Sequence, residues 1–151
     1  MSISLSEFAD KLNQIMPVIM KEIIRRDSNE LYKGKITLPQ LLTLGFLNEK
    51  GESRMTDLAR FMKVSTAAMT GVAERLVRDA YVLRVYNPQD RRIIKIKLKP
   101  KGAELVKKIN QQKRQMAINI FGKISESERE EYLRILTRIR DILAKENEAG
   151  L

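Results

Sequence analysis

The sequence predicts a mainly α-helical protein of the α+β class that contains one small antiparallel β-hairpin. Apolar residues recur at steps of three and four over most of the 151 residues, which is the spacing of one helix face. Between residues 81 and 98 the spacing changes to two, because isoleucine and leucine alternate with lysine in Ile94–Leu98. A chain of 151 residues, 43% of them hydrophobic, is long enough for a single domain with a buried core.

The first helix is expected over residues 5–26, where the apolar residues fall on one face. Ser4 and Glu7 have the spacing of a capping box at its start. Pro17 lies inside the pattern and is expected to kink the helix. The polar stretch 27–35 that follows is expected to be a connection.

The next three helices are marked by capping residues or a terminal glycine. The first begins after Thr37 and ends near Gly51, whereas Thr56 is expected to cap the second and Ser65 the third. The last two helices, over 55–78, are joined by a turn of two or three residues. This arrangement is typical of a helix-turn-helix.

The second helix of this pair has two different faces. The residues that follow the helical period and are expected to pack inward are Ala68, Met69, Val72, Ala73 and Leu76. The residues on the open face are small or polar, namely Ser65, Thr66, Ala67, Thr70, Gly71, Glu74, Arg75 and Arg78. A helix with such an open face is suited to close approach to another molecule.

Two antiparallel strands are expected over 82–98. β-Branched and aromatic residues mark the first strand, and the alternation with lysine marks the second. The turn between them is polar and contains Asp90, Arg91 and Arg92. Residues 36–99 are therefore predicted to form a winged helix-turn-helix lobe, with the hairpin as its wing.

Two long helices are expected after Pro100, which opens the first of them. Ser125 and Glu128 form a second capping-box pattern before the last helix. Apolar residues then follow at four-three-four spacing, at Tyr132, Leu136, Ile139 and Leu143. Such a stripe fits an intramolecular core or a dimer interface. Because the stripes of the first and last helices exceed what the small centre covers, we favour dimerisation helices over 1–35 and 100–151.

The composition excludes several kinds of site. Cysteine and histidine are absent, which removes disulfides, thiolate and imidazole metal ligands, and a histidine general base. Neither a glycine-rich phosphate loop nor paired catalytic carboxylates are found, so no catalytic site, metal site or cofactor is predicted. Because no stretch has the roughly 18 apolar residues of a membrane span and the first residues do not resemble a signal peptide, we expect a soluble, cytoplasmic protein that is not an enzyme.

The net charge of +10 is concentrated in the middle of the chain. Residues 54–101 include 12 basic and four acidic residues, so this third of the chain carries +8. A basic segment between nearly neutral ends is typical of a protein that binds an anionic polymer. The alternative is a solvated, lysine-rich surface without a partner.

An ordered set of short motifs runs through residues 36–106. The motifs are Leu38-Pro39-Gln40, Met55-Thr56-Asp57-Leu58-Ala59, Val64-Ser65, Thr70, Arg75-Leu76, Tyr81-Val82 with Arg84, Asp90-Arg91-Arg92, and Leu98 with Gly102. In order and spacing they resemble the MarR family of winged helix-turn-helix transcriptional regulators, and the flanking helices fit the layout of that family over the whole chain.

The resemblance implies a homodimer on a pseudo-palindromic, double-stranded DNA operator, with recognition helices in the major groove and wings in the minor groove. Carried over by position, the DNA-binding residues are Ser65, Thr66, Ala67, Thr70, Gly71, Arg75, Arg78, Asp90, Arg91 and Arg92. For Arg75 the alternative is an ion pair with Glu74 or Asp79. Two positions depart from the family: Ala80 replaces its usual glycine, so the helix is expected to end differently, and Lys99 replaces its usual threonine cap.

The resemblance also implies a small aromatic or phenolic effector. Its cleft would be lined by Met16, Met20, Tyr32 and Phe46, which fit a hydrophobic core equally well. We therefore expect a sequence-specific transcriptional regulator, more specifically a repressor that an effector releases. The alternatives are an architectural winged-helix protein that coats DNA without a ligand response, and an RNA-associated protein that uses the same basic surface.

Overall fold

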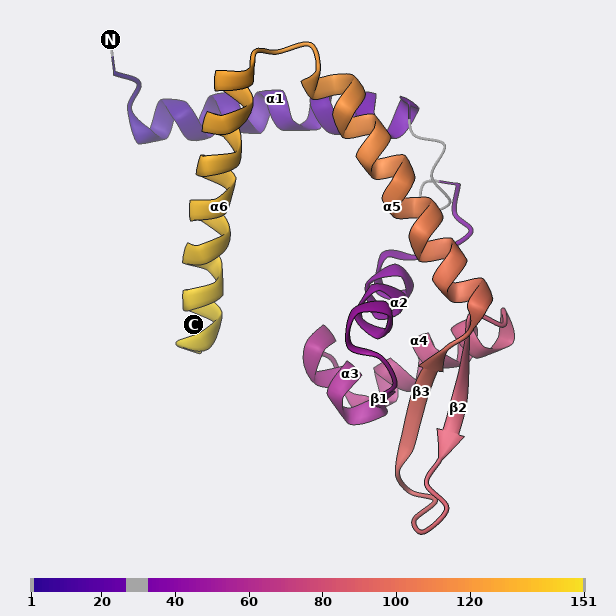
Figure 1. The fold of residues 1–151 in the computed structure, drawn as a ribbon. Helices are drawn as coiled ribbons and strands as arrows, with labels where there is room; N and C mark the ends of the chain where they lie inside the picture. The colour runs from indigo at the N-terminus through magenta and orange to yellow at the C-terminus, as the bar shows by residue number, and fades with distance from the viewer. Residues whose placement is uncertain (1, 27–32, 151) are drawn as a thin grey trace. The chain divides into compact units, whose positions relative to one another are not determined.

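A computed structural model describes residues 2–26 and 33–150 of the chain (Figure 1). The elements are α1 (Leu5–Arg26), α2 (Leu38–Lys50), β1 (Ser53–Arg54), α3 (Met55–Met62), α4 (Thr66–Arg78), β2 (Val82–Tyr86), β3 (Ile94–Leu98), α5 (Pro100–Phe121) and α6 (Glu126–Glu148). They fall into two compact units, Met1–Gln112 and Lys113–Leu151. The predicted fold class, mainly helical with a small β-wing, is confirmed.

The core of the first unit joins α2, α3, α4 and α5 to the sheet. The side chains that solvent does not reach at all are Thr43, Leu44, Leu58, Met69, Ala73, Leu76, Ile96 and Ile109. Thr43 is the polar member of this set, and its hydroxyl donates to the carbonyl oxygen of Pro39 at 2.8 Å. The buried hydroxyl is therefore satisfied within its own helix.

The sheet has three strands in the order β1-β3-β2, and both pairings are antiparallel. In the predicted hairpin, Val82 lies opposite Leu98 and Tyr86 lies opposite Ile94. The third strand, β1, was not predicted, and its Arg54 lies opposite Lys95 of β3. Because β1 leads directly into α3, this pairing ties the start of the helix-turn-helix to the wing.

The starts of the helices agree only in part with the prediction. Thr37 caps α2 in a capping box, in which its N–H donates to Gln40 Oε1 at 2.8 Å. Ser65 caps α4 as predicted. The predicted Thr56 cap is wrong, because α3 begins at Met55 and its N-cap is Arg54, whose side chain makes no capping bond. β1 pairs with β3 up to Arg54, and α3 begins directly after it, two residues earlier than a cap at Thr56 would place it.

A tight junction connects α4, β2 and α5. Ala80 has a φ of 63°, so α4 ends with a left-handed residue, as it would with glycine, and the expected different ending is wrong. Gly102 in α5 lies against the Tyr81 carbonyl, so a Cβ at this position would collide with backbone. Lys101 donates from Nζ to the Asp79 carbonyl at 2.7 Å, and its ammonium lies 4.7 Å from the centre of the Tyr81 ring.

The helices α1 and α6 contain no buried residue in the described part of the chain. Both predicted capping boxes are present, at Ser4 and Glu7 before α1 and at Ser125 and Glu128 before α6. α1 continues through Pro17. On α6 the stripe Tyr132, Leu136, Ile139 and Leu143 is 42–54% exposed. None of the described helices is long and apolar enough to cross a membrane.

Candidate nucleic-acid interface

The predicted recognition helix is α4, and its small, polar face is open to solvent. Ser65, Thr66, Ala67, Gly71, Arg75 and Arg78 are exposed, and Thr70 is half-buried. Ala68 is exposed too, so the prediction that it packs inward is wrong. The buried stripe runs through Met69, Ala73 and Leu76, and Ala68 lies about 100° around the helix from Met69. Its N–H donates to the capping hydroxyl of Ser65 at 3.1 Å.

The hydroxyl of Thr70 is already committed inside α4. It donates to the carbonyl oxygen of Thr66 at 2.8 Å. Phosphate oxygens only accept hydrogen bonds, so Thr70 does not donate to DNA phosphates in this rotamer. What Thr70 offers to a DNA base is its methyl group, or its oxygen as an acceptor for an amino group.

The side chain of Arg75 has no hydrogen bond or ion pair among the described residues. The two acidic neighbours considered as its partners pair with other arginines, Glu74 with Arg84 at 3.7 Å and Asp79 with Arg78 at 3.6 Å. The guanidinium of Arg75 is therefore available to a phosphate or a guanine edge, both of which it can bind bidentately.

At the tip of the wing, Asp90 holds Arg92. The Arg92 guanidinium donates from Nε to Asp90 Oδ1 at 3.1 Å and from Nη2 to Oδ2 at 3.4 Å, and the Arg92 backbone N–H donates to Oδ1 at 3.0 Å. These hydrogen bonds, the guanidinium first, lower the pKa of the Asp90 carboxyl from its usual 3.8. The expected Asp90 brace is therefore present, and it holds a guanidinium whose side chain is 92% exposed.

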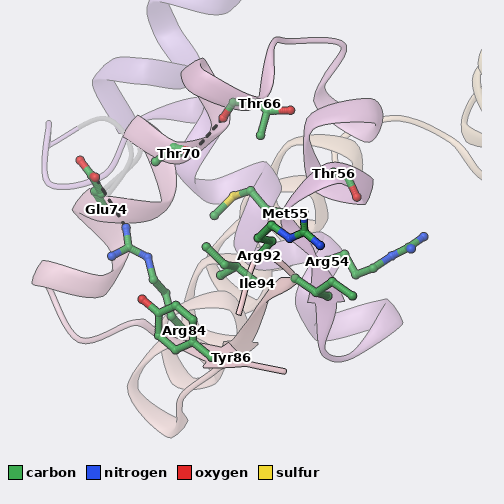
Figure 2. Close-up of a pocket in the computed structure, with 11 residues that line it drawn as sticks. Arg54, Met55, Thr56, Thr66, Thr70, Glu74, Arg84, Tyr86, Arg92 and Ile94 are labelled. Atoms are coloured by element: carbon green, nitrogen blue, oxygen red, sulfur yellow. Dashed lines mark hydrogen bonds and ion pairs between the residues drawn. The ribbon is translucent and has the colours of Figure 1, made fainter. Parts of the chain in front are cut away.

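A groove of about 480 Å³ lies between α4, the start of α3 and the wing (Figure 2). It is lined by Arg54, Met55, Thr56, Thr66, Thr70, Glu74, Arg84, Tyr86, Arg92, Ile93 and Ile94. Of the predicted DNA-binding residues, it brings together Thr66, Thr70 and Arg92. The others, Ser65, Ala67, Gly71, Arg75, Arg78, Asp90 and Arg91, are not part of its lining.

Sequence reasoning missed several residues of this groove. Arg84 and Tyr86 alternate with the outward positions of β2, so they lie on the same face as the buried Val82. The two-residue period could have placed both of them toward α4. For Arg54 there was no such signal, because a strand of two residues has no measurable period.

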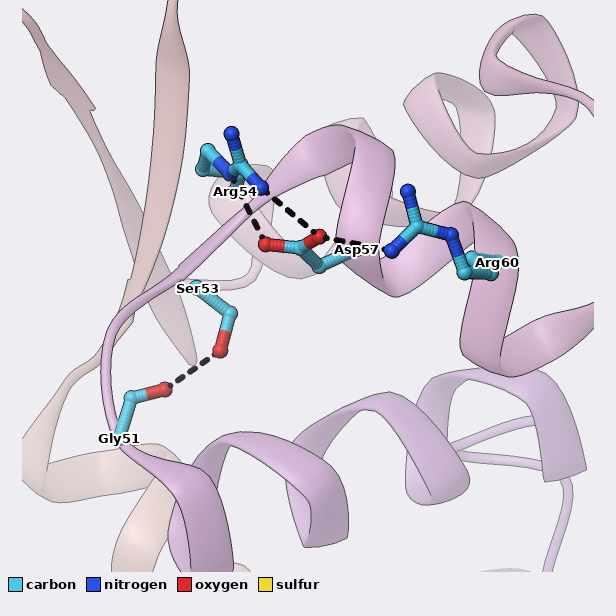
Figure 3. Close-up of polar contacts among 5 residues, drawn as sticks. All are labelled: Gly51, Ser53, Arg54, Asp57 and Arg60. Atoms are coloured by element: carbon cyan, nitrogen blue, oxygen red, sulfur yellow. Dashed lines mark hydrogen bonds and ion pairs between the residues drawn. The ribbon is translucent and has the colours of Figure 1, made fainter.

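Arg54 is held by Asp57 in a small ionic cluster at the start of α3 (Figure 3). Arg54 donates from Nε to Asp57 Oδ2 at 3.0 Å and from Nη2 to Oδ1 at 3.3 Å, and Arg60 approaches Oδ1 at 3.5 Å. The hydrogen bonds from Arg54 lower the pKa of Asp57 and raise that of Arg54. Two guanidinium groups on one carboxylate leave a positive charge that is fixed in place.

The residues considered for an effector cleft are not gathered by the structure. Met16 and Met20 on α1 are 43% and 42% exposed, so neither lies in the core of the chain. The Phe46 ring packs against the Phe61 ring at a tilt of 38°, with ring centres 4.5 Å apart. Tyr32 lies outside the described residues. No group of acidic residues in the described ranges could hold a metal ion.

Comparison with known proteins relates the part of the chain that contains the groove to a known family. Residues 36–94, which include α2, the helix-turn-helix and most of the wing, match the family model described as MarR family. This segment belongs to the MarR family. The resemblance read from the motifs is thereby confirmed for the lobe that contains every residue lining the groove.

Relatives and solved structures agree with this assignment. The chain is 27% identical over 105 residues to the uncharacterized HTH-type transcriptional regulator YpoP of Bacillus subtilis, which covers 70% of this chain and 74% of YpoP. It is 28% identical over 98 residues to the HTH-type transcriptional repressor MdtR of the same organism, covering 62% of this chain and 63% of MdtR. The crystal structure of YusO from B. subtilis has a TM-score of 0.75 at 21% identity, over 92% of this chain and 99% of YusO, and so shows the same fold.

Proposed function

We propose that the protein is a homodimeric transcriptional regulator that binds double-stranded DNA with sequence specificity, and that it is a repressor released by a small aromatic or phenolic effector. The observation that carries the proposal is the groove between α4 and the wing, where Thr66 and Thr70 of α4 and the arginines Arg84 and Arg92 of the wing line one space. The names of YpoP as a regulator and MdtR as a repressor support it.

The proposed complex follows from the shapes of the two elements. The major groove of B-DNA is about 12 Å wide and admits an α-helix. The exposed Ala67 and Gly71 let the α4 backbone approach the base edges closely. Arg92 at the wing tip then reaches the adjacent minor groove, where negative potential attracts arginine. Arg54, fixed by Asp57, is placed for a phosphate at the edge of the same site.

The dimer proposal rests on the apolar surface that a single chain leaves open. Ile15 and Ile19 on α1 and Leu136 and Ile139 on α6 are each more than 40% exposed. Monomeric proteins rarely expose large contiguous apolar patches, whereas helical dimers bury such stripes. Two-fold symmetry would place two α4 helices on successive major grooves, with half-site centres about 34 Å apart.

Titration of the purified chain on DNA tests the proposal and separates it from the architectural alternative. Footprinting on the DNA upstream of its own gene supplies the operator, and the reference is a random duplex of equal length. We expect at least about a thousandfold preference for the operator and a slope of log affinity against log salt of several units. A steep slope with no preference indicates an architectural protein, and a flat slope contradicts DNA binding altogether.

A further inference from the structure

One carboxylate, that of Glu74, lines the basic groove, and none of the proposed DNA contacts uses it. Glu74 lies one helical turn after Thr70 on α4, and both side chains line the groove (Figure 2). The Glu74 side chain is 63% exposed. Since DNA is a polyanion, a carboxylate at this position lowers affinity for DNA in general, unless it contacts a hydrogen-bond donor.

Arg84 holds this carboxylate from the other side of the groove. Its Nη2 lies 3.7 Å from Glu74 Oε1, and its own side chain is 27% exposed. The backbone of Arg84 is fixed opposite Ile96 in the middle of the β2–β3 ladder. The ion pair therefore offsets the charge of Glu74 and limits its orientation. Because 3.7 Å is longer than a hydrogen bond, the carboxylate oxygens keep their acceptor sites for another partner.

The groups that DNA presents restrict what that partner can be. An ionised carboxylate only accepts hydrogen bonds. Phosphate oxygens, guanine O6 and N7, adenine N7 and thymine O4 also only accept, so none of them can pair with Glu74. The donors in the major groove are the amino groups of cytosine N4 and adenine N6, and cytosine is the usual partner of glutamate.

We propose that Glu74 is a specificity-determining residue that accepts a hydrogen bond from a cytosine amino group in each half-site, and that Arg84 is its positioning residue. This inference rests on the proposed DNA-binding function. Glu74 selects the base mainly by exclusion. A base that presents only acceptor atoms gives the carboxylate no hydrogen bond and places partial negative charge beside it. Its presence lowers affinity for random DNA and raises the discrimination of the operator.

The test is a set of operator duplexes in which each half-site position carries each of the four bases, titrated with wild type and variants. For wild type, replacing the selected cytosine weakens binding at least about tenfold, the general range for one base contact. Glu74→Gln keeps an acceptor but adds a donor, so the preference at that position moves from cytosine toward adenine. Binding to random DNA tightens severalfold, and Glu74→Ala loses the preference without gaining another.

Glu49→Gln is the matched control, because Glu49 is exposed on α2, does not line the groove and pairs with Lys50 at 3.8 Å. It removes the same charge and leaves every base preference unchanged. For the positioning role, Arg84→Lys retains the cytosine preference, whereas Arg84→Gln weakens it at that position alone. Thermal melts by circular dichroism accompany each variant.

The results separate this inference from the function on which it rests. If wild type does not distinguish the operator from random DNA, the proposed function and the role of Glu74 both fail. If wild type discriminates and neither Glu74→Gln nor Glu74→Ala changes the preference at any position, the inference about Glu74 is overturned and DNA recognition stands. Loss of preference in Glu49→Gln would show a general charge effect and would also overturn it.

Discussion

At the scale of single residues, Ala80 shows that a helix ending can survive without its usual amino acid. Its N–H donates to the Val77 carbonyl at 3.0 Å, and the Tyr81 N–H donates to the Leu76 carbonyl at 2.9 Å. These are the two hydrogen bonds of a Schellman motif, which normally has glycine at the left-handed position. Val82, two residues later, is 1% exposed, so burial of the following strand holds the chain in this conformation.

Ala80→Gly is expected to stabilise the fold, because a left-handed conformation costs alanine about 1 kcal/mol more than glycine. The melting temperature should rise by roughly 2–4 °C, the scale of such a change in a chain of this size. Ala103→Gly is the control: Ala103 lies inside helix α5, where glycine lowers stability by about 0.5–1 kcal/mol. A fall in melting temperature for both variants would contradict the strain at Ala80.

Gly71→Ala separates the stability of α4 from its approach to DNA. A Cβ at Gly71 would meet no atom within 4 Å, so the fold should gain about 0.5–1 kcal/mol from better helix propensity. The added methyl group faces the proposed base contacts, and operator affinity should fall. Gly45→Ala in α2 also has open space and should stabilise without changing affinity. Equal operator binding by both variants would mean that α4 does not approach DNA at Gly71.

At the scale of elements, the sequence predicted what depends on local repeats and capping residues. The helix α4 with its Ser65 cap and the hairpin of β2 and β3 follow from periods of 3.6 and 2, which extend over several residues. The strand β1 exists only because Ser53 and Arg54 meet a distant strand, so no local pattern predicts it. For the same reason Thr56 was predicted to cap the helix that follows β1, and Arg54 was absent from the predicted site.

In the candidate site, too, the residues set by local pattern were predicted, and those that depend on a distant contact were not. Thr66, Thr70 and Arg92 were predicted because each stands at a recognisable place in a helix or a turn. Glu74 was seen on the open face of α4, but its use depends on Arg84, which comes from another element at 3.7 Å. Sequence periodicity gives the face of a residue within one element, and it does not give the partner across a groove.

For the wing, the expected effect is that Arg92→Ala weakens operator binding by about 1–3 kcal/mol without changing the melting temperature. Asp90→Asn should weaken it less, because Arg92 keeps its charge and loses its brace. The pKa of Asp90 is lowered, so the brace is complete above the usual value of 3.8 and is lost as pH falls through the lowered pKa. Binding measured from pH 5 to 8 should therefore show no titration of Asp90.

At the scale of the whole molecule, the chain carries two kinds of surface that bear on association, one apolar and one basic. Apolar side chains line α1 and α6, and +8 of the net charge of +10 lies in residues 54–101. Association of two chains through the apolar helices would bury the first surface and double the second. The proposed dimer thus links stability of the terminal helices to affinity for a polyanion.

Leu136→Glu tests this link, because it places a charge in the apolar stripe of α6, where Leu136 is 42% exposed. Sedimentation at micromolar concentration should show a dimer for wild type and a shift to monomer, or loss of folding, for the variant. Arg138→Gln changes the charge of α6 by the same amount outside the stripe, and should leave the dimer intact. A folded wild-type monomer at these concentrations would contradict the dimer, whatever the variants do.

The junction at Gly102 fixes the first turn of α5 to the helix-turn-helix and the wing. Its first turn is joined to the end of α4 and the start of β2 by backbone contact at Tyr81, by the Lys99 N–H on the Tyr81 carbonyl at 2.9 Å, and by Lys101 on Asp79. Because three contacts within residues 99–102 hold this end of α5 to Tyr81 and Asp79, we expect α4 and the wing to follow a rotation of the first turn of α5. A rotation of this first turn would then reach the groove between α4 and the wing as a change of angle, with no need to unfold anything between.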